Sequence, residues 1–138
     1  MNLYVDSSIL LRFVLGQADR FLGLLQASRC ISSTLLEVEC LRALDRAQLS
    51  RVYDDDEIAA QHGAAYHLLR RTDLVELTGS VLGRAAAPLP VALGTLDAIH
   101  LATAQALRDR RYPELQLATH DLALARAGRA LGFAVHGA

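Results

Sequence analysis

The chain has 138 residues, of which 52% are hydrophobic and 21% are charged. This length fits one globular domain with a sizeable core, and the composition excludes an intrinsically disordered chain. The formal net charge of −1 excludes a strongly basic surface of the kind that binds nucleic acid along its whole length. All 14 basic residues are Arg and none is Lys, which excludes every mechanism that needs a lysine.

The cysteine content and the hydropathy pattern indicate the compartment. Cys30 and Cys40 are too few for a disulfide framework, and their spacing matches no zinc motif. We therefore expect buried free thiols in a cytoplasmic protein. No apolar stretch reaches the roughly 20 residues that a membrane-spanning helix needs. The first residues also lack the basic region of a secretory signal, so we expect no membrane association.

Short apolar runs alternate with amphipathic ones along the chain. In chain order, we predict a strand at 3–5, helices at 7–15 and 20–27, a strand at 29–32, and helices at 33–49 and 54–71. There follow a strand at 74–77, a helix at 80–87, a loop at 88–95, a helix at 96–110, a strand at 115–119, a helix at 121–131 and a strand at 133–137.

This alternation predicts an α/β fold in a single domain spanning residues 1–138. We expect a three-layer α/β/α sandwich around a central parallel sheet of about five strands. The pattern does not determine the order of the strands. A sheet of this kind binds its ligands at the carboxyl ends of the strands, next to the topological switch point.

Three acids lie at predicted strand ends or helix starts. Asp6 follows the strand at 3–5, Asp121 follows the strand at 115–119, and Asp97 lies in the first turn of the helix at 96–110. Each acid also suits a helix N-terminus, where it could act as a cap or complement the dipole. Ser7 and Thr119 compete for two of those capping positions.

A fourth acid comes from the helix at 33–49. Its apolar residues form one stripe on a helical wheel, and Glu37 and Glu39 flank that stripe on opposite sides. Periodicity does not choose between the two glutamates, and a solvated helix face would explain either of them.

The acids taken together indicate a metal ion. Strand ends and helix starts meet at the same edge of a parallel sheet, so these carboxylates should gather there. Gathered carboxylates repel one another unless a cation is present. Oxygen ligands are preferred by hard divalent ions, and the chain offers no matching set of His and Cys. The pattern therefore predicts Mg²⁺ or Mn²⁺ rather than structural zinc.

Several other α/β families do not fit. A phosphoacceptor receiver domain normally needs a Lys near its last strand, and the chain has none. A dehalogenase-type phosphatase needs Asp-x-Asp after the first strand, where Ser8 stands two residues after Asp6. The chain also lacks the two glycine-rich motifs that bind nucleotides.

Four segments resemble, in order, the four motif regions of PIN-domain ribonucleases, above all those of VapC-type toxins from type II toxin–antitoxin pairs. They are "LYVDSSILLRFVL", "ISSTLLEVECLRAL", "LGTLDAIHLATAQAL" and "LATHDLALARAGRALGF", and the third and fourth are the most specific. The resemblance covers nearly the whole chain. It implies a PIN-like fold and a metal-dependent endoribonuclease that leaves a 5′-phosphate and a 3′-hydroxyl.

The resemblance also implies which residues form the site. The catalytic and metal-binding acids would be Asp6, Glu39, Asp97 and Asp121, with Mg²⁺ or Mn²⁺ as the cofactor. The family's spacing of Glu followed three residues later by Arg selects Glu39 with Arg42 over Glu37. Ser7 and Thr119 match the small hydroxyl positions beside the first and last acids. Ser7, Arg42 and Thr119 are therefore expected to bind substrate.

The implied partners are an RNA substrate, a cognate antitoxin that covers the site, and a second copy of the chain in a homodimer. The apolar helices of residues 33–70 are the expected partner surface. The main alternative is a catalytically weak PIN-like module that binds RNA or protein. His100, one turn after Asp97, could orient that acid, although a packed core histidine is the more ordinary explanation.

Overall fold

The computed structural model describes all 138 residues, and a five-stranded sheet lies at its centre. Every pair of neighbouring strands is parallel, and the order is β3-β2-β1-β4-β5. The strands are β1 (Asn2–Val5), β2 (Arg29–Ser33), β3 (Thr72–Val75), β4 (Gln116–Ala118) and β5 (Val135–His136). The prediction of a three-layer α/β/α fold with about five parallel strands is confirmed.

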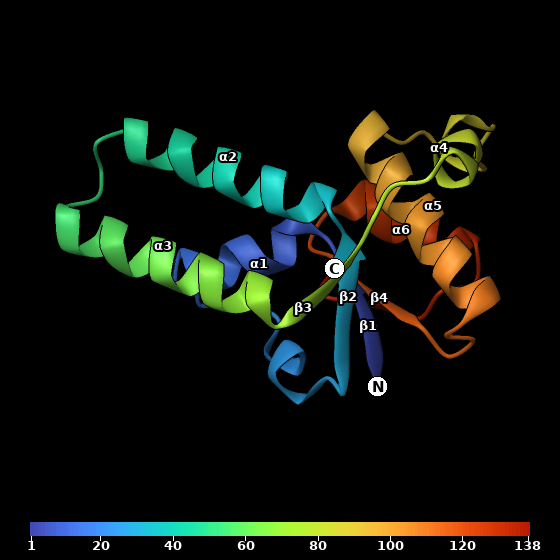
Figure 1. The fold of residues 1–138 in the computed structure, drawn as a ribbon, viewed down its shortest axis with the longest axis horizontal. Coiled ribbons are helices and arrows are strands. Elements are labelled where there is room, and N and C mark those ends of the chain that lie inside the picture. The colour runs from blue at the N-terminus through green and yellow to red at the C-terminus, as the bar shows by residue number, and fades with distance from the viewer.

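Helices cover both faces of the sheet (Figure 1). On one face lie α1 (Ser7–Val14), α2 (Leu35–Leu49) and α3 (Asp55–Arg70). On the other lie α5 (Thr95–Arg110) and α6 (Leu122–Ala130), with α4 (Gly79–Ala86) packed against α5. None of these helices combines the length and the apolar character that a bilayer crossing requires.

The central strand β1 supplies residues to both cores. Leu3 and Val5 pack with Leu36 on the α1–α2 side, whereas Tyr4 packs with Leu101 on the α5 side. Consecutive residues of a strand point to opposite faces, so a strand that is covered on both sides is apolar throughout. Leu3, Tyr4 and Val5 are all fully buried.

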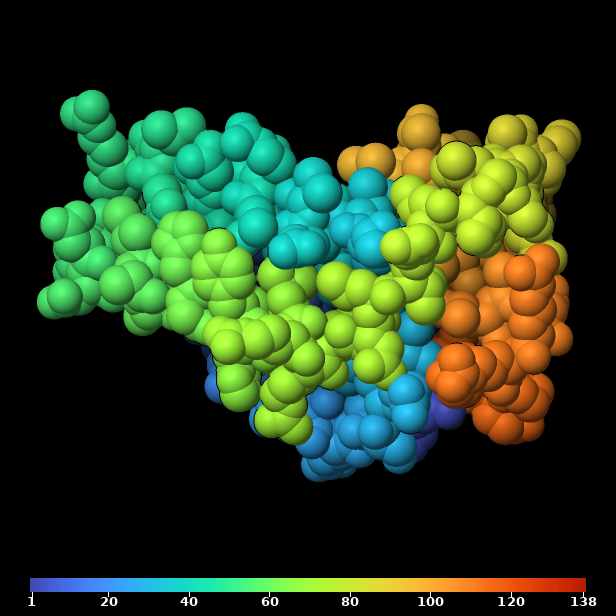
Figure 2. Space-filling view, in the orientation of Figure 1, coloured from blue at the N-terminus to red at the C-terminus, as the bar shows by residue number.

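Helices α2 and α3 form an antiparallel hairpin that projects beyond the sheet (Figures 1 and 2). Near the sheet, Cys40 and Leu69 belong to the core. Farther out, Leu44 of α2 and Ala65 of α3 form a smaller cluster. The tip of the hairpin is exposed, with Leu49 at 73% and Val52 at 74% of their maximal accessible surface.

Two predicted elements differ from the structure. The helix expected at 20–27 is a short 3₁₀ helix, η1 (Leu22–Gln26), in which a side chain at Gly23 would clash with the ring of Phe21. The strand expected at 74–77 lies at 72–75, because the register with β2 pairs Cys30 with Thr72. Of the two free thiols, Cys40 is buried and Cys30 is only partly buried.

The space around two helical glycines predicts opposite effects of adding a side chain there. A Cβ added at Gly128 would lie 2.5 Å from Cδ2 of the fully buried Leu117, whereas a Cβ at Gly63 of α3 would meet open space. We expect Gly128→Val to lower the free energy of unfolding by about 1–3 kcal/mol through overpacking. Gly63→Ala should raise it by up to about 1 kcal/mol. Urea denaturation of both variants measures this, and a Gly128→Val protein as stable as the wild type would contradict the tight packing.

Candidate metal centre

The site lies where the order of the sheet reverses. From β1 the chain goes outward to β2 and β3, and then returns to place β4 on the other side of β1. The carboxyl ends of β1 and β4 therefore form the topological switch point, where open α/β sheets bind their ligands. Asp6 directly follows β1, and Asp121 lies three residues after β4. The register pairs Val5 with Ala118, so Asp6 lies beside Thr119.

The carboxylate of Asp6 is buried and held by two hydroxyl groups. Its Oδ1 accepts a hydrogen bond from Ser8 at 2.6 Å, and its Oδ2 accepts one from Thr119 at 2.8 Å. Asp6 occupies the N-cap position of α1, yet its side chain makes no capping hydrogen bond. Burial raises its pKa, and the two hydroxyl donors oppose that rise. The hydroxyls of Ser8 and Thr119 therefore hold this carboxylate at the start of α1.

Ser8 and Thr119 join the end of β1 to the end of β4. The hydroxyl oxygen of Ser8 accepts the backbone N–H of His120 at 2.9 Å, and that of Thr119 accepts the N–H of Asp121 at 3.0 Å. The family resemblance singled out Ser7, which is next to Asp6 in the sequence, and sequence reasoning missed the role of Ser8. Thr119 has no exposed surface, so its hydroxyl positions the acids and faces no solvent.

Asp121 both caps a helix and faces the site. Its Oδ1 accepts the N–H of Leu124 at 2.8 Å, which caps α6. A capping hydrogen bond therefore confirms the capping explanation for Asp121, whereas Asp6 occupies its N-cap position without such a bond. Capping leaves Oδ2 of Asp121 without a hydrogen-bond partner in the chain, so that oxygen remains available to a ligand.

The structure distinguishes the two glutamates of α2. Glu37 is exposed, whereas the side chain of Glu39 keeps only 15% of its accessible surface. Oε1 of Glu39 lies 2.5 Å from Nε2 of His100. His100 is fully buried, as a packed histidine should be, but it contacts Glu39 and not Asp97. His100 therefore makes no hydrogen bond with which to orient Asp97, although it acts on that carboxylate electrostatically.

Asp97, in the first turn of α5, is the least constrained of the four acids. Its carboxylate is partly buried and makes no hydrogen bond with the chain. Burial is the main reason that its pKa rises to about 6. The negative charges of Asp121, Asp6 and Glu39 raise it further, and only His100 opposes them. Asp97 thus lies within electrostatic reach of the other three carboxylates, which add to the effect of burial on its pKa.

The charge of this cluster is not compensated by arginine. None of the ion pairs in the structure joins an arginine to one of the four acids, and the Arg42 guanidinium pairs with Asp45 at 3.1 Å instead. An uncompensated set of oxygen donors fits Mg²⁺ or Mn²⁺. No three His, Cys, Asp or Glu side chains are arranged to hold an ion by themselves. Mg²⁺ usually takes one or two carboxylates and completes its shell with water and substrate phosphate.

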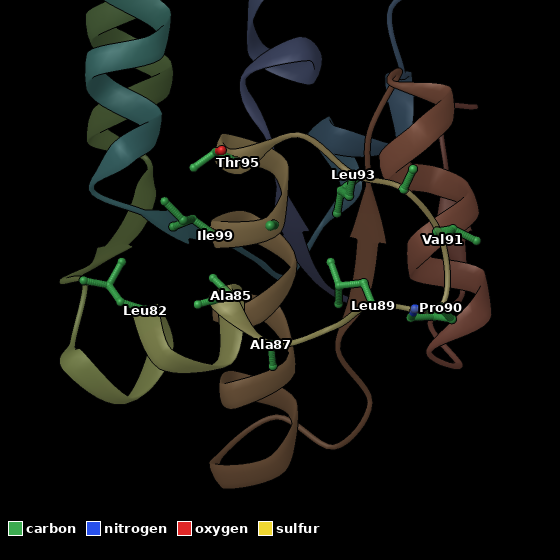
Figure 3. Close-up of a pocket in the computed structure, with 12 residues that line it drawn as sticks. Leu82, Ala85, Ala87, Leu89, Pro90, Val91, Leu93, Thr95 and Ile99 are labelled. Atoms are coloured by element: carbon green, nitrogen blue, oxygen red, sulfur yellow. The ribbon is translucent and has the colours of Figure 1, made fainter.

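The acids do not lie in the largest cavity. That cavity, of about 620 Å³, lies between α4, the loop at 87–94 and α5, and its lining is mostly apolar. Figure 3 shows Leu82 and Ala85 of α4 and Leu89 of the loop around it. A smaller cavity of about 330 Å³ between α1 and α2 does reach the site. We call it the α1–α2 groove, and it is lined by Ser7, Leu11, Leu35, Val38, Glu39, Arg42, Ala43, Arg46 and Leu96.

Because the other carboxylates repel Asp97, we expect its negative charge to lower the stability of the metal-free protein. Replacing Asp97 with Asn removes a charge that the other carboxylates disfavour. We expect Asp97→Asn to raise the Tm of the metal-free protein at pH 8 by roughly 2–6 °C, after allowance for solvent screening. The same variant should lose the further rise in Tm that Mn²⁺ gives the wild type. Differential scanning fluorimetry with EDTA and with Mn²⁺ measures both effects, and a metal-free variant that melts below the wild type would contradict the repulsion.

The hydrogen bonds of the Ser8 hydroxyl predict that Ser8 and its neighbour Ser7 have different roles. Ser8 holds Asp6 and the N–H of His120, whereas the side chain of Ser7 lines the α1–α2 groove. Ser8→Ala should weaken Mn²⁺ binding about tenfold, because residues that orient metal ligands typically contribute that much. Ser7→Ala should leave the Mn²⁺ affinity within about threefold of the wild type. Isothermal titration calorimetry compares the two, and equal losses would mean that Ser8 has no special role.

Comparisons with known proteins agree with this geometry. The model of the PIN domain family matches residues 3–130. Ribonuclease VapC46 of Mycobacterium tuberculosis (strain ATCC 25618 / H37Rv) is 34% identical over 139 residues, which cover 96% of this chain and 95% of that protein. The crystal structure of PAE2754 from Pyrobaculum aerophilum has the same fold, with a TM-score of 0.62 and 18% identity over 98% of this chain and 83% of that one. A full-length relative and a family match over most of the sequence show that this chain belongs to the PIN-domain family, as a VapC-type member.

Proposed function

We propose that residues 1–138 act as a single PIN-like domain with metal-dependent endoribonuclease activity, as the toxin of a type II toxin–antitoxin pair in the cytoplasm. The observation that carries this proposal is the set of four carboxylates at one sheet edge, with no arginine paired to any of them. The similarity to a protein named as a ribonuclease over nearly the whole chain supports it.

The four acids would bind Mg²⁺ or Mn²⁺ at the switch point. When bound, the ion supplies positive charge that neutralises the phosphate and lowers the pKa of the attacking water. Asp6 is fixed by two hydroxyls and Glu39 by an imidazole, so both are oriented before any ligand arrives. Asp121 keeps one oxygen unbonded, and Asp97 keeps its whole carboxylate free to adjust. Hydrolysis at this site would leave a 5′-phosphate and a 3′-hydroxyl.

The RNA strand would reach the acids through the α1–α2 groove. Ser7, Arg42 and Arg46 line this groove beside Glu39. The guanidinium of Arg42 is largely exposed, with 62% of its side-chain surface accessible, and so it is able to contact a phosphate. These contacts are to the backbone and favour no sequence, which is typical of phosphate binding. Thr119 would support the acids and would not contact the RNA, because its hydroxyl already donates to Asp6 and accepts the N–H of Asp121.

The cognate antitoxin would cover the same groove. Val38 and Leu96 there are 59% and 48% exposed, and Arg42 and Arg46 lie beside them. An inhibitory segment with apolar and acidic residues matches this combination of surface and charge. Such a segment would contact α2, within the region of residues 33–70 expected to meet partners. We also propose a homodimer, for which the exposed Leu82 beside the large apolar cavity offers a surface.

Cleavage of RNA by the purified chain tests the proposed activity. The chain, freed of any antitoxin, is incubated with total RNA in Mg²⁺ or Mn²⁺, and the fragment ends are mapped by sequencing. We expect cuts at a few defined sites, lost in EDTA and reduced at least about 100-fold in Asp97→Asn. Asp109→Asn is the matched control, because Asp109 lies on the same helix but pairs with Arg84 away from the site. Intact RNA with folded, metal-loaded protein would favour the binding module instead.

A further inference from the structure

A chain of two hydrogen bonds, the first buried and the second partly buried, ends on Glu39. The hydroxyl of Tyr4 lies 2.7 Å from Nδ1 of His100, and Nε2 of the same ring lies 2.5 Å from Oε1 of Glu39. Tyr4 and His100 are both fully buried. The rings meet edge to face with their centroids 5.7 Å apart, so the imidazole is also held by packing.

These two hydrogen bonds connect elements from all three layers of the fold. Tyr4 lies on β1 two residues before Asp6, and His100 lies on α5 one turn after Asp97. Glu39 lies on α2, which packs on the opposite face of the sheet from α5. The link therefore ties the glutamate to the strand and to the helix that carry two of the other acids. His100 is the only side chain in the structure that hydrogen-bonds to the carboxylate of Glu39.

Hydrogen-bond chemistry determines the direction of the contact with Glu39. An ionised carboxylate only accepts hydrogen bonds, so Nε2 of His100 must carry the proton that lies between them. In a neutral imidazole Nδ1 is then an acceptor, and the hydroxyl of Tyr4 is its donor. Oε2 of Glu39 has no partner in the chain and remains available for a ligand.

We propose that Tyr4 and His100 are positioning residues, which hold the Oε1 side of Glu39 so that Oε2 faces the metal ion. This inference rests on the proposed function, in which Glu39 is one of the metal-binding acids. A ligand that is oriented in advance loses less conformational freedom when the ion binds, and its affinity for the ion is correspondingly higher. Tyr4 acts only through His100 and contacts no ligand itself.

Mn²⁺ affinity, measured by isothermal titration calorimetry, tests the proposal independently of RNA cleavage. His100→Leu should weaken Mn²⁺ binding about 10–100-fold, as losses of orienting partners typically do. His100→Gln should recover most of that loss, because the amide nitrogen of Gln can donate a hydrogen bond from nearly the same place as Nε2. Tyr4→Phe, which removes only the hydroxyl, should fall between His100→Gln and His100→Leu. The free energy of unfolding of each metal-free variant is measured in parallel.

Two comparisons separate positioning from a merely structural role. His62→Gln removes another imidazole that bonds to α2, through Gln48 at 3.2 Å, but it does so far out on the hairpin and should leave Mn²⁺ binding unchanged. In a Glu39→Gln background, His100→Leu should cause little further loss of affinity, because the group it orients has lost its charge. An equal loss in both backgrounds, or an unchanged affinity in His100→Leu and Tyr4→Phe, would overturn the proposal.

The two hypotheses fail in different ways. A wild-type chain that binds Mn²⁺ but cuts no RNA contradicts the proposed function, while the affinities of the variants still decide the roles of Tyr4 and His100. A wild-type chain that binds no Mn²⁺ contradicts both hypotheses. If RNA is cleaved, the kcat of Tyr4→Phe should fall while its KM stays near the wild-type value, because Tyr4 lies away from the α1–α2 groove.

Discussion

The parallel pairing of β1 with both β2 and β4 is the constraint on which the core and the site depend. Because β1 is central, Leu3 and Val5 must fit one layer of helices while Tyr4 fits the other. The same pairing determines what lies beyond the strand. With Val5 opposite Ala118, Asp6 is placed beside Thr119, and the hydroxyl of Thr119 bonds to Asp6 and to the next turn of chain. A shift in this register would disrupt the core and the site together.

At the end of that strand, the fold holds four like charges close together and constrains three of them separately. Hydroxyls hold Asp6, a helix N-terminus holds Asp121, and an imidazole holds Glu39. Only Asp97 has no such support, and its pKa shows the resulting electrostatic cost most clearly. Sites that concentrate charge for function commonly reduce stability in this way. A cation would remove the repulsion without any change in the backbone.

Most of the fold and part of the site could be predicted from the sequence. Alternating periodicity located the five strands and most helices, and Asp6, Asp97 and Asp121 were identified by their positions at strand ends and helix starts. The strand predicted at 74–77 lies two residues earlier in the structure, at Thr72–Val75. Leu77 lies outside it and packs beside Val81. Strand pairing, which depends on distant segments, decided the register.

The supporting residues of the site could not be predicted, for a physical reason. Glu37 and Glu39 are equivalent by periodicity. The family resemblance selected Glu39, but its hydrogen bond to His100, 61 residues later in the chain, could not be foreseen. Ser7 and Ser8 are adjacent hydroxyls, and the direction of the first turn of α1 determines which one meets Asp6. Such contacts depend on how helices pack in three dimensions, whereas Asp6, Asp97 and Asp121 are placed by local rules of strand end and helix start.

The exposed tip of the α2–α3 hairpin lies at the opposite end of α2 from Glu39. Glu39 lies in the second turn of α2, where Leu36 and Cys40 fix the helix to the core. The turn between α2 and α3, with Leu49 and Val52 exposed near it, lies at the far end of the projection (Figure 2). Lengthening the hairpin, or changing its tip, would therefore leave the geometry of the acids as it is. The outer turn of the hairpin and the sheet edge that carries the acids are thus structurally independent of each other.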